Sequence, residues 1–123
     1  ETDARLIEYS LDRSVPLLGV CRGMQSILLY FGGALERISG HVAVCHDVSG
    51  AISRTVNSYH NWGARQTPSK LEVLARAADG VVEAISVKGR PIAGIMWHPE
   101  RVSPFAQDDI RLMKAVFEQG DSL

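Results

Sequence analysis

The chain has few cysteines, no long apolar segment and no excess of charge, and each absence excludes a class of protein. Two cysteines among 123 residues are too few for a disulfide-stapled secreted domain and fit a reducing, cytoplasmic compartment. The longest apolar stretch, residues 27–35, includes two glycines and falls well below the roughly 18 residues of a membrane span. Thirteen basic and fourteen acidic side chains give a net charge of −1. We therefore expect no nucleic-acid partner and no membrane partner.

The remaining composition is that of one globular domain. Hydrophobic residues make up 46% and charged residues 22% of the chain, which is too apolar and too weakly charged for intrinsic disorder. A length of 123 residues matches a single folding unit. The sequence begins with Glu1 instead of methionine and shows no signal-peptide pattern, so we expect a further segment upstream.

The first third of the chain predicts a helix, a buried strand and a second helix. Residues 3–13 have helical spacing of apolar side chains, and Pro16 ends this helix. Pro16–Val20 is a short apolar run without alternation, which is typical of a parallel strand that is covered on both faces. Residues 22–31 place apolar side chains at i, i+3, i+4 and i+7, and two glycines follow them.

The rest of the chain predicts short strands and a closing helix. The strand candidates are residues 34–38, 42–46, 71–77, 81–87 and 91–97. Two turn-forming pairs, Asp79-Gly80 and Lys88-Gly89, separate the last three candidates, so we expect antiparallel hairpins there. Residues 105–119 predict a helix, and its expected apolar stripe is Ile110, Met113, Val116 and Phe117. This pattern indicates the α/β class with a mixed sheet.

The most informative motif is Gly19-Val20-Cys21-Arg22-Gly23, a G-x-nucleophile-x-G pattern with cysteine as the nucleophile. It lies between a predicted buried strand and a predicted helix, where a sharp turn would lift one side chain clear of the sheet. We expect Gly19 and Gly23 to be required because a Cβ at either position would collide with the turn. The helix N-terminus should favour the Cys21 thiolate, and the free Arg22 amide could donate to an oxyanion.

A thiol nucleophile needs a base, and His98 is the best placed of the four histidines. It directly follows a predicted apolar strand, and a rigid Pro99-Glu100 step comes after it. This step could turn the Glu100 carboxylate onto the imidazole, which predicts a Cys21, His98 and Glu100 triad. Taken alone, the His-Pro-Glu sequence is more typical of a solvated loop.

Neither the second cysteine nor the histidines near it predict a functional site. Cys45 lies inside a predicted strand without a flanking glycine, so we expect it to be buried and inert. The group of His41, Cys45 and His46 lacks the C-x₂₋₄-C spacing of zinc sites, and no second cluster supplies the remaining ligands. The sequence therefore predicts no metal site.

Three segments together resemble the class I glutamine amidotransferase-like superfamily. They are PLLGVCRGMQSILLYFGG at 16–33, VNSYHNWGA at 56–64 and GIMWHPER at 94–101. Within the superfamily they are most similar to the γ-glutamyl hydrolase branch, which includes γ-glutamyl-γ-aminobutyrate hydrolases. The resemblance implies a flavodoxin-like, mixed but mostly parallel sheet flanked by helices.

By position, the resemblance implies the same catalytic residues and adds a substrate-binding set. Cys21 would be the nucleophile, His98 the general base and Glu100 its partner. The implied substrate-binding residues are Arg22, Gln25, Ser58, Tyr59 and His60. Without the resemblance, Gln25 would be assigned to a helix surface, Tyr59 to the core, and His60 equally to packing or function.

The implied activity is hydrolysis of a small γ-glutamyl amide through a γ-glutamyl thioester, without a cofactor or metal. Members of this family have strands and a glycine-rich loop before the elbow, and that loop donates the second oxyanion amide. Because these are missing here, we expect residues 1–123 to be the C-terminal portion of one larger domain. We also expect an exposed sheet edge beside Pro16–Val20 that could bind a second copy or a partner chain. The alternatives are a glutaminase subunit that supplies ammonia to a synthetase partner, and a non-catalytic fragment.

Overall fold

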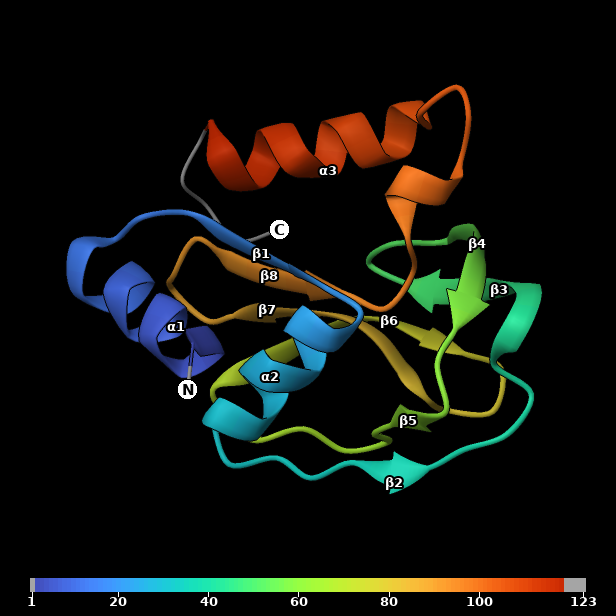
Figure 1. Cartoon of the computed structure of the whole chain (residues 1–123), viewed down its shortest axis with the longest axis horizontal. Helices are drawn as coiled ribbons and strands as arrows, with labels where there is room; N and C mark the ends of the chain where they lie inside the picture. The colour runs from blue at the N-terminus through green and yellow to red at the C-terminus, as the bar shows by residue number, and fades with distance from the viewer. Residues whose placement is uncertain (1, 119–123) are drawn as a thin grey trace.

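The computed structural model describes residues 2–118 as helices packed on both faces of a curled sheet (Figure 1). The helices are α1 (Thr2–Arg13), α2 (Arg22–Tyr30), the short 3-10 helix η1 (Pro99–Arg101) and α3 (Gln107–Phe117). The strands are β1 (Leu17–Val20), β2 (Glu36–Arg37), β3 (Val42–Gly50), β4 (Arg54–Tyr59), β5 (Trp62–Gly63), β6 (Leu71–Ala77), β7 (Val82–Val87) and β8 (Ile92–Ile95). The predicted end of the last helix at residue 119 lies outside the described residues.

The main sheet is mixed and mostly antiparallel. Its six strands follow the order β1-β8-β7-β6-β3-β4, and of its pairs in the described chain β1 with β8 is the parallel one. The expectation of a mostly parallel sheet is therefore wrong for this chain. Short turns join β6 to β7 and β7 to β8, as the two predicted turn pairs require, and short turns permit only antiparallel neighbours.

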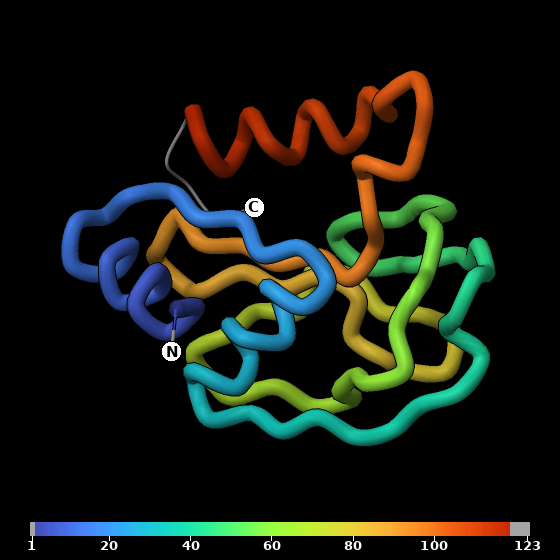
Figure 2. Tube along the Cα trace, viewed as in Figure 1, coloured from blue at the N-terminus to red at the C-terminus, as the bar shows by residue number. Residues whose placement is uncertain are grey.

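Two strands, β4 and β5, have no counterpart among the predicted elements. β4 pairs with β3, and β5 forms a separate two-stranded sheet with β2. Only two positions of β4 are buried, Val56 and Ser58, so its sequence shows little apolar alternation. The tube in Figure 2 follows the long segment after α2 along one side of the molecule to β3.

The core has two parts, one on each face of the sheet. On the first face, Met24, Ile27 and Leu28 of α2 pack with Ile7 of α1 against apolar side chains of the sheet. On the second face, α3 covers the sheet (Figure 1) and buries Leu112 and Val116. The arrangement is a three-layer α/β fold.

The buried face of α3 differs from the predicted stripe. Asp109, Leu112 and Val116 are buried, whereas Phe117 is 49% exposed. Asp109 is buried because Arg54 and Trp97 satisfy its carboxylate: Arg54 Nη1 and Trp97 Nε1 donate to Oδ1 at 2.7 and 2.9 Å. The buried face of α3 thus includes a paired acid in addition to apolar side chains.

Strand β1 lies at one edge of the sheet. It pairs with β8 through Leu17↔Ile92 to Val20↔Ile95, and its other side has no neighbouring strand in residues 2–118. Because β1 and β8 are parallel, both end at the same edge of the sheet. The residues that follow these two strands, Cys21 and His98, are thereby brought to the same region. None of the helices described is both long and apolar enough to cross a membrane.

Candidate active site

Cys21 occupies the sharp turn between β1 and α2 that its motif predicts. Its backbone has φ 53° and ψ −98°, a left-handed conformation that side-chain-bearing residues rarely adopt. Two backbone hydrogen bonds hold the turn: Cys21 N–H donates to the Ile95 carbonyl at 2.6 Å, and Gln25 N–H donates to the Cys21 carbonyl at 3.1 Å. The nucleophile candidate is thus fixed to both β8 and the first turn of α2.

The two glycines of the motif have different roles. A Cβ on Gly19 would lie 2.6 Å from the Gly23 carbonyl carbon and 2.8 Å from the Met24 nitrogen, so β1 and α2 approach closely because residue 19 is glycine. A Cβ on Gly23 would have no heavy atom within 4 Å among the described residues, apart from its chain neighbours and the backbone of α2 itself. The steric requirement is therefore confirmed for Gly19 and wrong for Gly23.

The environment of Cys21 does not stabilise a thiolate in the way the sequence predicts. Burial raises the pKa of the Cys21 thiol, and the nearby Glu83 and Glu100 carboxylates raise it further. The Arg22 backbone N–H and the Arg101 guanidinium oppose this rise but do not reverse it. These surroundings therefore favour the thiol over the thiolate.

His98 is positioned by the end of β8 and by Asn57. It lies three residues beyond Ile95, which is the register partner of Val20, the residue directly before Cys21. The Asn57 side chain binds the His98 backbone twice: Nδ2 donates to the His98 carbonyl at 2.9 Å, and Oδ1 accepts from the His98 N–H at 2.7 Å. Sequence reasoning missed Asn57, because nothing in the sequence relates a residue of β4 to the end of β8.

Glu100 contacts the imidazole as the sequence predicts. Glu100 Oε2 lies 2.6 Å from His98 Nδ1. Burial would raise the pKa of the Glu100 carboxyl, but the hydrogen bond with His98 and the nearby Arg101 charge lower it below its ordinary value. An ionised carboxylate can only accept a hydrogen bond, so Nδ1 carries the hydrogen and Nε2 is left as the basic nitrogen.

Two exposed side chains lie beside this pair. The rings of Tyr59 and His98 are 5.8 Å apart in an edge-to-face arrangement, and the Arg101 guanidinium lies 4.1 Å from the centre of the Tyr59 ring. Tyr59 is 38% exposed, so it is a surface residue of the site and not part of the core. Arg101 is also the cation whose charge acts to lower the pKa of the Cys21 thiol.

The other predicted substrate-binding residues are divided between surface and interior. Arg22 is exposed, and the half-buried Gln25 donates from Nε2 to the Trp62 carbonyl at 3.1 Å. Ser58 and His60 are buried, and the Ser58 hydroxyl donates to the His41 carbonyl at 2.7 Å. The structure therefore brings Tyr59 to His98, while the side chains of Ser58 and His60 make contacts inside the protein.

Cys45 is exposed, so the expectation that it is buried is wrong. Strand β6 pairs with β3 only along Val48–Gly50, and the first part of β3 therefore projects beyond the body of the sheet. Neighbouring residues of a strand face opposite ways. Since His46 is half-buried and turned toward Glu83, Cys45 points to solvent.

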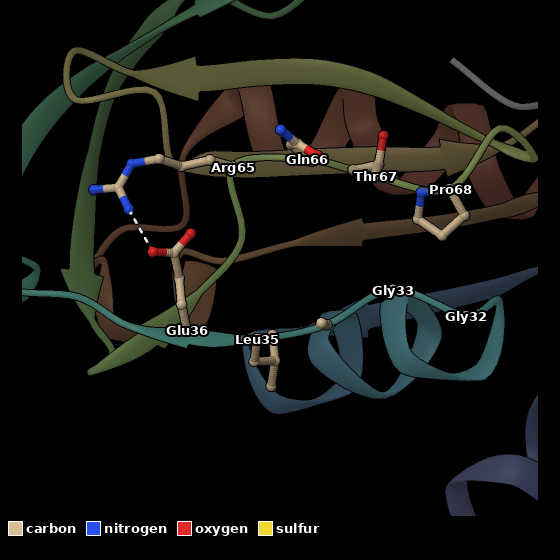
Figure 3. Close-up of a pocket in the computed structure, with 9 residues that line it drawn as sticks. Gly32, Gly33, Leu35, Glu36, Arg65, Gln66, Thr67 and Pro68 are labelled. Atoms are coloured by element: carbon tan, nitrogen blue, oxygen red, sulfur yellow. Dashed lines mark hydrogen bonds and ion pairs between the residues drawn. The ribbon is translucent and has the colours of Figure 1, made fainter.

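An open pocket elsewhere on the molecule is separate from Cys21. It is formed by the segment after α2 and the segment before β6, and Glu36 and Arg65 form an ion pair of 2.9 Å at one end of it (Figure 3). Cys21 precedes the first residue of α2, whereas this pocket begins at Gly32 beyond the last. A nine-residue helix is about 13 Å long, so the two sites lie at opposite ends of α2.

Comparison with known proteins agrees with the segments quoted from the sequence. The family profile described as Glutamine amidotransferase class-I matches residues 1–115. The chain belongs to the class I glutamine amidotransferase family. It is 34% identical over 116 residues to the γ-glutamyl-CDP-amidate hydrolase of Campylobacter jejuni, which covers 94% of this chain and 56% of that protein. It is 33% identical over 126 residues to the γ-glutamyl-γ-aminobutyrate hydrolase of Escherichia coli O157:H7, which covers 77% of this chain and 50% of that protein.

A solved amidotransferase structure has the same fold. The glutamine amidotransferase from Thermotoga maritima superimposes with a TM-score of 0.72 at 17% sequence identity, over 96% of this chain and 55% of that one. The chain therefore spans about half the length of the curated relatives and of the structure that it matches.

Proposed function

We propose that the protein hydrolyses the γ-glutamyl amide bond of a small γ-glutamyl compound. The observation that carries the proposal is that Cys21 and the His98–Glu100 pair follow adjacent parallel strands of one sheet. Similarity to two γ-glutamyl hydrolases supports this substrate class. Cys21 is the proposed nucleophile, His98 the general base and Glu100 the group that orients and stabilises the imidazole.

In the proposed reaction His98 transfers one proton in each half. As Cys21 Sγ attacks the γ-carbonyl carbon, His98 Nε2 takes the thiol proton, because burial keeps the pKa of the thiol high. The Arg22 backbone N–H, at the start of α2, stabilises the oxyanion. The carbon–nitrogen bond then breaks, His98 returns the proton to the departing amine, and a γ-glutamyl thioester remains. Water that gives its proton to His98 attacks the thioester and releases glutamate and the free thiol.

The proposed substrate-binding residues are those implied by the family segments. Tyr59 lies against His98, and Gln25 lies one helical turn from Cys21. Arg22 is exposed at the start of α2. We propose that Ser58 and His60 act mainly by holding the strand end that presents Tyr59, because both are buried and bonded within the protein.

We further propose that residues 1–123 form the C-terminal portion of a larger amidotransferase domain. Strand β1 pairs on one side only in the described chain, and the relatives are about twice as long as their matched parts. A second oxyanion donor would come from the additional segment. Its absence would lower turnover by about 10²–10³-fold.

The test is a substrate panel with the full-length gene product. Glutamine and a set of γ-glutamyl amines are incubated with the protein, and the released amine is identified by mass spectrometry. We expect release of glutamate with a primary amine, nearly complete loss of activity in Cys21→Ser, and full activity in the matched control Cys45→Ser.

The other outcomes separate the alternatives. Ammonia released from glutamine alone, and more rapidly with a cell lysate that contains a synthetase, would replace the proposal by a glutaminase subunit. No turnover of any substrate by the full-length protein would leave the non-catalytic alternative.

A further inference from the structure

A cluster of histidines surrounds one fully buried carboxylate, Glu83 of β7. Glu83 is 0% exposed, and His41 and His60 are 2% and 4% exposed. His41 Nδ1 lies 3.3 Å and His60 Nε2 3.5 Å from Glu83 Oε2, and His46 Nε2 lies 3.7 Å from Glu83 Oε1. One donor atom each from His41, His46 and Glu83 lie within 4.8 Å of one another. Three titratable side chains from separate segments thus meet at one point, and His60 contacts the same carboxylate.

The polar atoms that face this point have no hydrogen-bond partner in the described residues. These atoms are His41 Nδ1, His46 Nε2, His60 Nε2 and both Glu83 carboxylate oxygens. Buried polar groups in proteins are almost always satisfied, so five unpaired atoms at one place need an explanation. Ser86 Oγ is the only other such buried side-chain atom among residues 2–118. The unpaired atoms are therefore concentrated at this cluster.

The opposite ring nitrogens of two of these histidines are already engaged. His41 Nε2 lies 2.7 Å from Asp79 Oδ2, and His60 Nδ1 lies 3.1 Å from the Trp62 carbonyl oxygen. Carboxylate and carbonyl oxygens only accept hydrogen bonds, so these nitrogens carry the hydrogens. In the neutral form of each ring, the nitrogen that faces Glu83 carries the lone pair. Lone pairs directed at a buried carboxylate repel it unless a cation lies between them.

We infer that His41, His46 and Glu83, with His60 as the fourth ligand, form a binding site for a divalent transition-metal ion of the Zn²⁺ type. Imidazole nitrogens and a carboxylate are ligands that Zn²⁺ accepts in four-coordinate sites. Ligand atoms at about 2.0–2.1 Å from a tetrahedral ion lie about 3.3 Å from one another. The three separations between Glu83 and the histidines, 3.3, 3.5 and 3.7 Å, fit that arrangement after small side-chain adjustments.

The surroundings of the cluster match those of a structural metal site. A histidine ligand usually donates its second ring N–H to a carboxylate or a carbonyl, as His41 does to Asp79 and His60 does to Trp62. The four ligands come from the segment before β3, from β3, from the segment after β4 and from β7. A bound ion would join the β3–β4 hairpin to β7, to which β3 has no direct strand pairing. Two of these ligands, His41 and His46, belong to the histidine–cysteine group for which the sequence predicts no metal site, because Glu83 and His60 lie far from that group along the chain.

The inference can be tested by metal binding alone, independently of hydrolytic activity. The full-length protein is stripped with EDTA, exchanged into chelator-free buffer and titrated with Zn²⁺ by calorimetry. Co²⁺ is then substituted, because its visible absorption reports tetrahedral coordination. We expect one Zn²⁺ per chain, tetrahedral Co²⁺ spectra, and a thermal midpoint that rises with Zn²⁺ concentration.

Variants identify the ligands. Loss of an outer partner lowers metal affinity by about 10–100-fold, so we expect that effect for Asp79→Asn and a loss of more than about 100-fold for His46→Ala and Glu83→Gln. His46 is half-buried, which makes its removal the variant best tolerated by the fold, and circular dichroism checks that each variant is folded.

Two controls remove other zinc-binding groups. His98→Ala and Cys45→Ser take away a histidine and an exposed thiol outside the cluster, and both should bind Zn²⁺ like the wild type. The inference is overturned if the stripped protein binds no Zn²⁺ stoichiometrically. It is also overturned if folded His46→Ala and Glu83→Gln keep wild-type affinity, or if either control abolishes binding.

Discussion

Replacing the two glycines of the nucleophile turn by alanine should have opposite effects on stability. In Gly19→Ala the new Cβ would lie 2.6 and 2.7 Å from the carbon and oxygen of the Gly23 carbonyl. These are backbone atoms at the start of α2, and β1 is held in place by its pairing with β8. Neither side can move by a simple side-chain rotation, so the two elements must separate.

The magnitude follows from this geometry. Overpacking of a filled interior costs about 1–3 kcal/mol, and a contact with backbone belongs at the upper end, near ~3 kcal/mol. For a domain of 123 residues, 1 kcal/mol corresponds to roughly 3–5 °C in thermal midpoint, so the expected decrease is about 10–15 °C. Gly23→Ala meets no atom within 4 Å and restricts the unfolded chain, so it should stabilise the protein by about 0.5–1 kcal/mol.

Thermal unfolding followed by circular dichroism measures both effects in parallel. Gly19→Ala should also slow γ-glutamyl amide hydrolysis, because displacing α2 moves the Arg22 N–H away from the oxyanion position. If Gly19→Ala unfolds within about 2 °C of the wild type, or if both variants lose stability equally, the close approach of β1 to α2 is refuted.

Thiol reactivity, the buried Asp109 pair and the Asn57 clamp on His98 can each be tested by one measurement. Burial raises the pKa of Cys21 whereas Cys45 is exposed, so iodoacetamide at neutral pH should label Cys45 faster. Labelling of Cys21 should keep increasing as the pH is raised above the ordinary thiol range. Peptide mapping that finds Cys21 labelled first would contradict this. Asp109→Ala removes a buried, paired carboxylate and should lower the free energy of unfolding by about 3–5 kcal/mol, as measured by chemical denaturation. The control Asp108→Ala, at the adjacent exposed position, should change it by less than about 0.5 kcal/mol. Equal losses in the two variants would argue against the buried pair. Asn57→Ala removes both hydrogen bonds from Asn57 to the backbone of His98 and should lower kcat more than it raises KM. An unchanged kcat would show that these two hydrogen bonds do not position the candidate base.

The elements that the sequence predicts well are those with a strong local pattern. Three parts of the structure lie within a few residues of their expected bounds: the amphipathic helix α2, the apolar strand β1 and the two turns between β6 and β8. Strand β4 was missed because its buried positions are Val56 and a serine whose hydroxyl is bonded within the protein. A strand that buries polar side chains lacks the alternation on which its prediction depends.

Long-range pairing is the part that local patterns cannot give. The apolar run of β1 is compatible with a central parallel strand, yet in the described chain it lies at the edge and has one parallel neighbour. In the same way the strand containing Cys45 was predicted, but the side on which this cysteine lies depends on how far β6 extends along β3. Burial on a strand is decided by its neighbours and not by its own residues alone.

The contacts of the candidate site also differ in whether a local sequence pattern predicts them. The sharp turn at Cys21 and the His98–Glu100 contact could be predicted because the turn motif and the His-Pro-Glu step are each contiguous in the sequence. The contacts of Asn57 and Glu83 could not be predicted in this way. Asn57 binds the backbone of His98 from β4, and Glu83 lies next to histidines from three separate segments. Their roles exist only once the sheet has formed.

The thiol and the buried carboxylate are linked through charge. Glu83 is one of the groups that raise the pKa of Cys21, although burial of the thiol contributes more. A cation held among the histidines would cancel the negative charge of Glu83 without contacting the sulfur, and it would leave burial and Glu100 as the groups that oppose ionisation. In the proposed triad Glu100 orients His98, so its unfavourable effect on the thiolate accompanies that proposed role. The thiolate would then form by transfer of the thiol proton to His98, which is the step that the proposed mechanism assigns to this residue.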